Sequence, residues 1–149
     1  MKITVLNGPN LNLLGVREPA IYGATTLPEV EAQLTDLARA LGVELEFAQE
    51  NSEGALVGIV HSLRGRVHGA IINAGAYSHS SIAIRDALVG CEIPFVEVHV
   101  TNVYAREPER RHSMLAQAAV GVVVGLGTQG YGLALRGLVT ALTARGTGA

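Results

Sequence analysis

The chain has 149 residues, of which 48% are hydrophobic and 16% are charged, and its formal net charge is −2. This length predicts a single domain over residues 1–149, and the near-neutral charge without a basic stripe argues against nucleic acid and anionic membranes as partners. No apolar run reaches the roughly 18 residues of a membrane-spanning helix, and the first residues lack the apolar region and cleavage site of a signal peptide.

The low charged fraction and the rarity of two residue types support further expectations. An average globular chain has roughly 25% charged residues, so we expect part of this surface to be buried in an oligomer. Cys91 is the only cysteine, which excludes an internal disulfide framework and favours a cytoplasmic protein. Lys2 is the only lysine and starts the first predicted strand. It lies away from the edge where α/β sheets bind ligands, so a Schiff-base mechanism, which needs a lysine in a pocket, is disfavoured.

Short apolar runs alternate along the chain with segments of helical periodicity. The first strand is predicted at Lys2–Asn7, and the loop 8–23 follows it. Strand-to-helix connections usually take a few residues, so this loop is unusually long. Thr26 and Glu29 have the spacing of a capping box, and a glycine follows Leu41. These signals predict a helix from Thr26 to Leu41.

The remaining elements continue this alternation. Strands are predicted at Val43–Ala48, Gly69–Asn73, Phe95–His99 and Val120–Gly125, and helices at Glu53–Leu63, Ser80–Val89 and Gln129–Arg145. Several strands are nearly continuous apolar runs, as expected for a parallel sheet covered on both faces. The pattern predicts an α/β fold, a flavodoxin-like doubly wound sheet of five parallel strands in three α/β/α layers. The terminal segment "RGTGA" is expected to be frayed.

The segment "GLGTQG" at Gly125–Gly130 matches the G-x-G-x-x-G pattern of dinucleotide-binding proteins. That fingerprint opens a βαβ unit and has an acidic residue about twenty positions further on, whereas only one helix follows here. A tight strand-to-helix turn fits better, and a binding module that cradles FMN or another phosphate stays open as an alternative. A receiver-type signalling domain would need clustered aspartates after the first strand, but Asp36 and Asp86, the only two, fall in predicted helices.

Two pairs of residues suit acid–base chemistry. Glu97 and His99 are two apart on a predicted strand and share a face. A carboxylate beside an imidazole favours the imidazolium, so His99 is either a general acid or a structural histidine. Arg17 lies five residues before Tyr22 in the long loop. A close cation favours phenolate and makes tyrosine, with an ordinary pKa near 10, a usable base; a surface arginine beside a half-buried tyrosine fits this spacing equally well.

Other polar residues gather where the predicted strands end, the edge at which such sheets bind ligands. Asn73 ends a strand, and His79 precedes a helix whose N-terminus suits an anion. Asp86 is more simply an exposed helix charge. Arg106 and Arg110 suit an anionic, hydroxylated small molecule or else belong to a solvated loop. The five histidines show no metal-ligand spacing, so no metal is expected.

Four long segments follow one another in the order "VLNGPNLNLLGVREPAIYG", "IINAGAYSHSSIAIRDAL", "PFVEVHVTNVYAREPERRHS" and "VGLGTQGYGLALRGL". Together they cover nearly the whole chain, and they resemble the type II 3-dehydroquinate dehydratase family. The resemblance implies a lyase without metal or cofactor that converts 3-dehydroquinate to 3-dehydroshikimate. The reaction would be an anti elimination through an enolate, in the shikimate pathway or in quinate breakdown. The implied assembly is a homododecamer, a tetramer of trimers.

The resemblance also implies catalytic roles. Tyr22 would remove the proton next to the ketone, and Arg17 would support the phenolate and close with the loop as a lid. Asn10 would help to hold the water that stabilises the enolate oxygen. His99, supported by Glu97, would protonate the leaving hydroxyl.

The implied substrate-binding set has two parts. The substrate carboxylate would be bound by Asn73 and by the backbone of Val100 and Thr101. The ring hydroxyls would be bound by His79, Arg110 and, from a neighbouring subunit, Asp86, with Arg106 near the lid. Two departures from the family pattern are Val-Thr at 100–101 in place of Ile-Ser, and Ser52 in place of a histidine.

Overall fold

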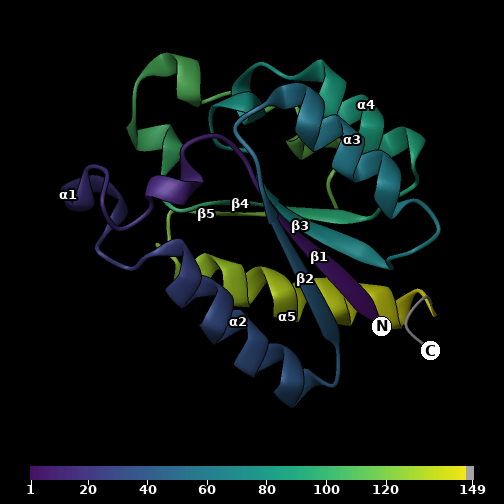
Figure 1. The fold of residues 1–149 in the computed structure, drawn as a ribbon. Coiled ribbons are helices and arrows are strands. Elements are labelled where there is room, and N and C mark those ends of the chain that lie inside the picture. The colour runs from purple at the N-terminus through teal and green to yellow at the C-terminus, as the bar shows by residue number, and fades with distance from the viewer. Residues whose placement is uncertain (147–149) are drawn as a thin grey trace.

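The computed structural model describes residues 1–146, so residues 147–149 of the terminal segment 145–149, which is expected to be frayed, lie outside the described part. Five parallel strands form one sheet in the order β2-β1-β3-β4-β5 (Figure 1). Their bounds are β1 Lys2–Asn7, β2 Glu44–Gln49, β3 Gly69–Asn73, β4 Phe95–His99 and β5 Gly121–Val124. This strand order is that of the flavodoxin-like doubly wound fold, so the predicted fold class is confirmed.

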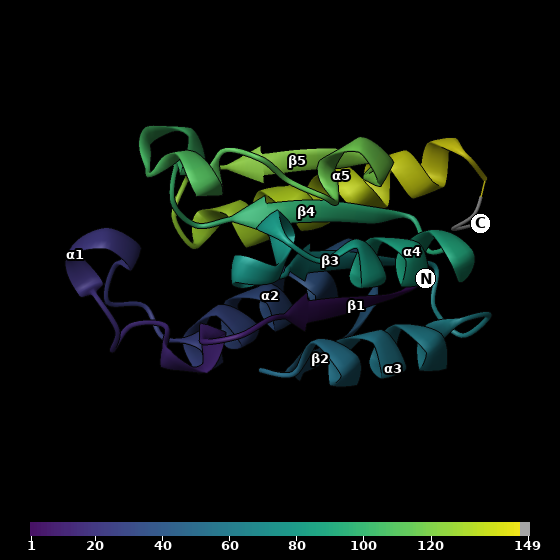
Figure 2. The ribbon, with the colours of Figure 1, turned by 90° about the horizontal axis from the view of Figure 1, so that it is seen from above.

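Helices cover both faces of the sheet, as Figures 1 and 2 show. One face carries α2 (Leu27–Leu41) and α5 (Gln129–Ala144), and the other carries α3 (Glu53–Leu63) and α4 (Ile82–Gly90). Each layer encloses its own cluster of buried apolar side chains. Hydroxyl N-caps explain where three helices begin, because Thr26, Ser52 and Ser81 each accept a hydrogen bond from a backbone N–H in the first turn. Ser52 therefore has a structural role at its position.

Short helical turns occupy segments that the sequence pattern predicts as loops. The long loop contains the 3-10 turn η1 (Leu11–Leu13) and the four-residue α1 (Pro19–Tyr22). Further 3-10 turns are η2 (Gly75–His79), η3 (Val103–Ala105), η4 (Pro108–Arg110) and η5 (Ala116–Ala118). Such turns are too short to show an apolar period. The other boundaries differ from the predicted ones by at most two residues, the largest being α4, which begins at Ile82 rather than Ser80.

The carboxyl ends of the strands meet at one edge of the sheet, on the left of Figure 1, together with α1. Gly8 directly follows β1, and a Cβ there would lie 2.4 Å from the carbonyl oxygen of Ala74. Only glycine therefore lets the ends of β1 and β3 run side by side. Gly125 has a φ of +87° after β5, so "GLGTQG" forms the predicted tight turn into α5.

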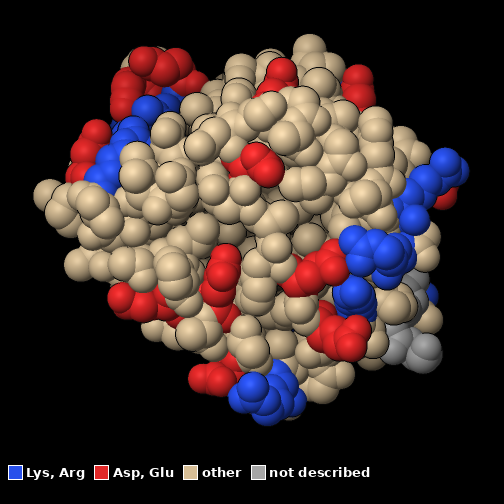
Figure 3. All heavy atoms as spheres, in the orientation of Figure 1, with Lys and Arg blue, Asp and Glu red and all other residues tan. Residues whose placement is uncertain are grey.

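Charged side chains are sparse on the surface. The face in Figure 3 is mostly uncharged, with a few groups of mixed charge and several acidic side chains that stand alone. Among the described residues, no helix is long and apolar enough to cross a membrane.

Candidate active site

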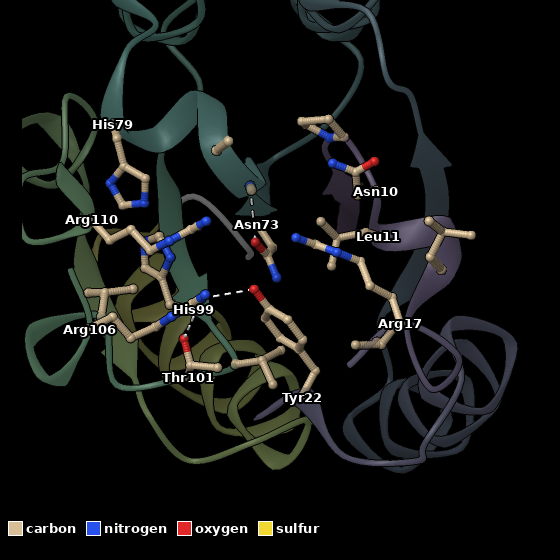
Figure 4. Close-up of a pocket in the computed structure, with 17 residues that line it drawn as sticks. Asn10, Leu11, Arg17, Tyr22, Asn73, His79, His99, Thr101, Arg106 and Arg110 are labelled. Carbon is tan, nitrogen blue, oxygen red and sulfur yellow. Dashed lines mark hydrogen bonds between the residues drawn. The ribbon is translucent and has the colours of Figure 1, made fainter. Parts of the chain in front are cut away.

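A pocket of about 180 Å³ opens at the carboxyl edge of the sheet (Figure 4). Segments that follow β1, β3 and β4 form its walls. Most predicted site residues line it, namely Asn10, Arg17, Tyr22, Asn73, His79, His99, Val100, Thr101, Arg106 and Arg110. The structure thus brings together groups that lie up to 100 positions apart in the sequence, from Asn10 to Arg110.

Tyr22 is the last residue of α1 and lines this pocket, where its hydroxyl accepts a hydrogen bond from a guanidinium group. Arg106 Nη1 donates a 2.8 Å hydrogen bond to Tyr22 Oη, as the dashed line in Figure 4 marks. The same guanidinium lies 5.3 Å from the centroid of the tyrosine ring, and that of Arg17 lies 5.4 Å from it. The phenol ring therefore has two guanidinium groups within 5.4 Å of its centroid. Arg106, whose side chain is 16% exposed, is therefore the arginine in direct contact with the phenol oxygen.

The imidazole of His99 is held by a buried carboxylate. His99 Nε2 donates a hydrogen bond to Glu97 Oε2, and both residues belong to β4. Glu97 is 0% exposed, so a negative charge there needs compensation. Because Nε2 is bound to the carboxylate, Nδ1 is the nitrogen of His99 that can exchange a proton with a ligand.

Ser113 is a residue of this site that the sequence did not predict. Its Oγ lies 2.8 Å from both carboxylate oxygens of Glu97. The backbone N–H groups of Leu115 and Ala116 each donate to that Oγ at 3.0 Å. With the two acceptor sites of the hydroxyl occupied, its single proton is directed to Glu97. The histidine, the glutamate and the serine therefore form one ordered chain.

His79 stands beside His99, with ring centroids 6.0 Å apart. Its Nδ1 lies 2.8 Å from the carbonyl oxygen of His112. A carbonyl can only accept, so Nδ1 carries a proton and Nε2 is the ring atom available to a ligand. Arg110 lines the same wall, and its Nε donates to both carboxylate oxygens of Glu107 at 3.0 and 3.1 Å.

The backbone around Asn10 is fixed in an unusual conformation. Asn10 has a φ of 69°, a left-handed region that asparagine tolerates better than most residues. Its N–H donates to Asn51 Oδ1 at 3.0 Å, and Gln49 Nε2 donates to the same oxygen at 3.1 Å. The loop after β2 therefore anchors the start of the long loop. The spacing of Asn51 from Asn10 gave no sign of this contact.

Two predicted site residues do not line the pocket. Glu97 lies behind His99, as a supporting residue would. Asp86 lies on α4, where its side chain is 70% exposed and pairs with Arg85 at 3.6 Å. A role for Asp86 at this chain's own pocket has no support in the structure, and its predicted role across a subunit boundary stays a prediction. No group of three histidine, cysteine or acidic residues that could hold a metal ion occurs within residues 1–146.

The pocket thus holds a tyrosine paired with a guanidinium, an imidazole paired with a buried carboxylate, and further arginines for an anionic ligand. A doubly wound α/β domain with such a pocket at its carboxyl edge has the architecture of an enzyme that acts on a small molecule.

Comparisons with known proteins define the family. The model of the family described as dehydroquinase class II matches residues 1–139. A 3-dehydroquinate dehydratase of Gemmatimonas aurantiaca is 61% identical over 95% of this chain and 93% of its own length. A catabolic 3-dehydroquinase of Aspergillus oryzae is 57% identical over 89% of this chain and 87% of its own.

A solved structure agrees with these matches. The type II dehydroquinase of Propionibacterium acnes superposes with a TM-score of 0.89 at 45% identity, over 93% of this chain and 96% of that one. The chain therefore belongs to the class II dehydroquinase family, as the resemblance of its four segments predicted. Membership in this family replaces the alternative of a module that binds FMN or another phosphate.

Proposed function

We propose that this protein dehydrates 3-dehydroquinate to 3-dehydroshikimate, with Tyr22 as the base and His99 as the acid. One observation carries the proposal: the two groups share one pocket, and each has a partner of opposite charge. The phenol is bound by Arg106 and the imidazole by Glu97. The names of the relatives supply the substrate, and the shikimate pathway and quinate breakdown share this reaction.

In the first step, Tyr22 removes the proton next to the ketone, which leaves an enolate. The guanidinium of Arg106 has donors only, so its contact with Tyr22 Oη directs positive charge at the phenol oxygen. Arg17 adds a second cation over the ring. The loop that carries Arg17 and Tyr22 acts as a lid that opens for substrate and then excludes water from the enolate.

In the second step, His99 gives a proton from Nδ1 to the leaving hydroxyl, which departs as water. The buried carboxylate of Glu97 stabilises the imidazolium before transfer, and Ser113 holds that carboxylate in place. An anti elimination needs base and acid on opposite faces of the substrate ring. Tyr22 on the loop after β1 and His99 at the end of β4 come from different walls of the pocket, which fits that requirement.

The remaining polar groups are assigned to binding. The anchored Asn10 holds the water at the enolate oxygen. Asn73 and the backbone N–H groups of Val100 and Thr101 bind the carboxylate, while His79 Nε2 and Arg110 bind ring hydroxyls. None of these steps uses a metal or a cofactor.

We further propose that the single domain works in the cytoplasm as a homododecamer, a tetramer of trimers, in which Asp86 completes a neighbour's pocket. The low charged fraction of 16% supports burial of surface. Asp86 lies on α4 between Ile82 and Val89, which are 50% and 56% exposed. The three positions follow the i, i+4, i+7 spacing of one helix face, so Asp86 stands in an exposed apolar stripe suited to an interface.

The test is to add 3-dehydroquinate and to follow the ultraviolet absorbance of the conjugated enone product. The wild-type protein should produce that absorbance. Tyr22→Phe keeps the ring but removes the base, and turnover should fall at least about 10²-fold, the scale of one positioned proton transfer. Tyr104→Phe, at a 61% exposed position, is the matched control and should be unaffected. Near wild-type turnover in Tyr22→Phe would end the assignment of the base.

A further inference from the structure

A buried chain of hydrogen bonds runs beneath the pocket and ends at Asn73. Asn73 Oδ1 accepts from the Gly75 N–H at 3.2 Å, and Asn73 Nδ2 donates to Tyr131 Oη at 3.0 Å. Tyr131 Oη in turn donates to Asn7 Oδ1 at 2.6 Å. Asn7 and Asn73 are paired in register at the ends of β1 and β3, and Tyr131 comes from α5. Three distant segments therefore meet around one hydroxyl.

The backbone N–H of Gly75 decides which group donates and which accepts in each of these hydrogen bonds. Its N–H can only donate, so the oxygen of Asn73 must face it and the nitrogen of Asn73 must face Tyr131. Tyr131 then accepts at its oxygen, and its one proton goes to Asn7. A reversed amide at Asn73 would bring two donors together at Gly75.

These directions leave the side-chain nitrogen of Asn7 without a hydrogen-bond acceptor among the described residues. Asn7 is 1% exposed, and its Nδ2 has no hydrogen-bond partner among the described residues. A buried amide hydrogen without a partner is unfavourable. A reversed amide at Asn7 gives no relief, because its nitrogen would then face the proton of Tyr131. Burial raises the pKa of the Tyr131 hydroxyl. The hydroxyl therefore keeps its proton, and the donors and acceptors along this series of hydrogen bonds stay as described.

We propose that Tyr131, held by Asn7, is a positioning residue that orients the amide of Asn73 toward the substrate. The nitrogen of Asn73 has two hydrogens, of which Tyr131 takes one. The other is then directed into the pocket that Asn73 and Tyr22 both line (Figure 4). This inference rests on the proposed function, in which Asn73 binds the substrate carboxylate.

The experiment is steady-state kinetics of Tyr131→Phe with 3-dehydroquinate. The phenyl ring keeps the packing of a side chain that is 0% exposed, while the acceptor for Asn73 is lost. Because a carboxylate contact binds substrate and transition state alike, KM should rise about tenfold with kcat changed less than about twofold. Tyr104→Phe removes an exposed hydroxyl and should change neither constant.

A double-mutant cycle separates positioning from a general structural effect. If Tyr131 acts through Asn73, then Tyr131→Phe should have no further effect on kcat/KM in an Asn73→Ala background. If Tyr131→Phe does not fold, Asn7→Leu tests the same hydrogen bonds by removing the acceptor of Tyr131. KM should rise by the same factor, and Asn7→Leu should have no further effect on kcat/KM in the Asn73→Ala variant. Additive effects, or a fall in kcat at constant KM, would overturn the inference. A wild-type protein inactive on 3-dehydroquinate would instead overturn the proposed function, and this inference with it.

Discussion

The replacement Glu46→Gln tests the electrostatics of the edge strand β2, at a residue that does not line the pocket. Glu46 on β2 accepts two hydrogen bonds from the guanidinium of Arg66, at 2.8 and 3.1 Å. Thr4 Oγ1 donates to it at 2.9 Å, and Lys2 Nζ lies 3.3 Å away. The hydrogen bonds from Arg66, with smaller contributions from Thr4 and Lys2, lower the pKa of Glu46 from 4.5 to about 2.

The magnitude follows from linkage between protonation and folding. Each pH unit between the unfolded and folded pKa is worth about 1.4 kcal/mol, so the interval sets an upper bound of about 3 kcal/mol. The side chains of Glu46 and Arg66 are 30% and 46% exposed, and solvent screening reduces this to about 1–2 kcal/mol. In a chain of this length, that loss lowers Tm by about 3–6 °C.

The sign of the pH dependence follows from a folded pKa that is lowered. The stabilisation by the Glu46 carboxylate is fully present above pH 4.5 and is lost as the pH falls toward 2. The difference in Tm between wild type and Glu46→Gln should therefore be largest at pH 7 and should shrink to less than about half by pH 3.

The assay is thermal unfolding followed by circular dichroism at pH 7, 4 and 3, at one protein concentration. Asp36→Asn is the matched control, because Asp36 pairs with Arg39 at 3.0 Å but its side chain is 79% exposed. It should cost less than about 0.5 kcal/mol at any pH. A Tm difference for Glu46→Gln that stays constant from pH 7 to pH 3, or that Asp36→Asn matches, would refute the reasoning.

Four further predictions concern the pocket. Arg106→Met removes the donor to Tyr22 and should lower kcat at least about 10²-fold in the absorbance assay. Ser113→Ala removes the hydroxyl that holds Glu97 and should lower kcat about tenfold or more, while Ser113→Thr should retain most of the activity. Asp86→Ala and Tyr22→Phe subunits, unfolded together and refolded, should regain activity in roughly a quarter of sites, because one half times one half of the sites receive both intact groups. Activity should persist after dialysis against EDTA, and after borohydride treatment in the presence of substrate.

Each of these predictions has an outcome that contradicts it. Arg106→Met with unchanged kcat would remove this arginine from the base step, provided that circular dichroism shows a native fold. Equal activity of the alanine and threonine variants at Ser113 would exclude a role for its hydroxyl. A mass tag would confirm that the subunits mix. If the mixed subunits then show no more activity than the separately refolded mutants, Asp86 serves its own subunit or lies outside the site. Inactivation by EDTA or by borohydride, without unfolding, would show that the proposed mechanism without a metal or an imine is wrong.

Local sequence signals were sufficient for most of the secondary structure. The predicted bounds of α3, β3 and β4 agree with the structure to the residue, because apolar runs and capping residues act over a few neighbouring positions. The fold class also followed from five alternating units and the family resemblance. Most residues of the candidate site came from that resemblance rather than from spacing, since short polar motifs such as "REPAIYG" had equally good structural explanations.

The pairing of Glu97 with His99 followed from their spacing on one strand, but only the tertiary structure decided the long-range partners inside the site. Arg106 lies 84 positions from Tyr22, and the sequence paired Tyr22 with the nearer Arg17 instead. Ser113 reaches Glu97 through the turns after β4, and Tyr131 lies 124 positions from Asn7. Such contacts depend on which strands are neighbours and on how each loop folds back over their ends. No period or spacing in the chain encodes that geometry, so the sequence determined the elements and the chemistry, while the fold determined which donor meets which acceptor.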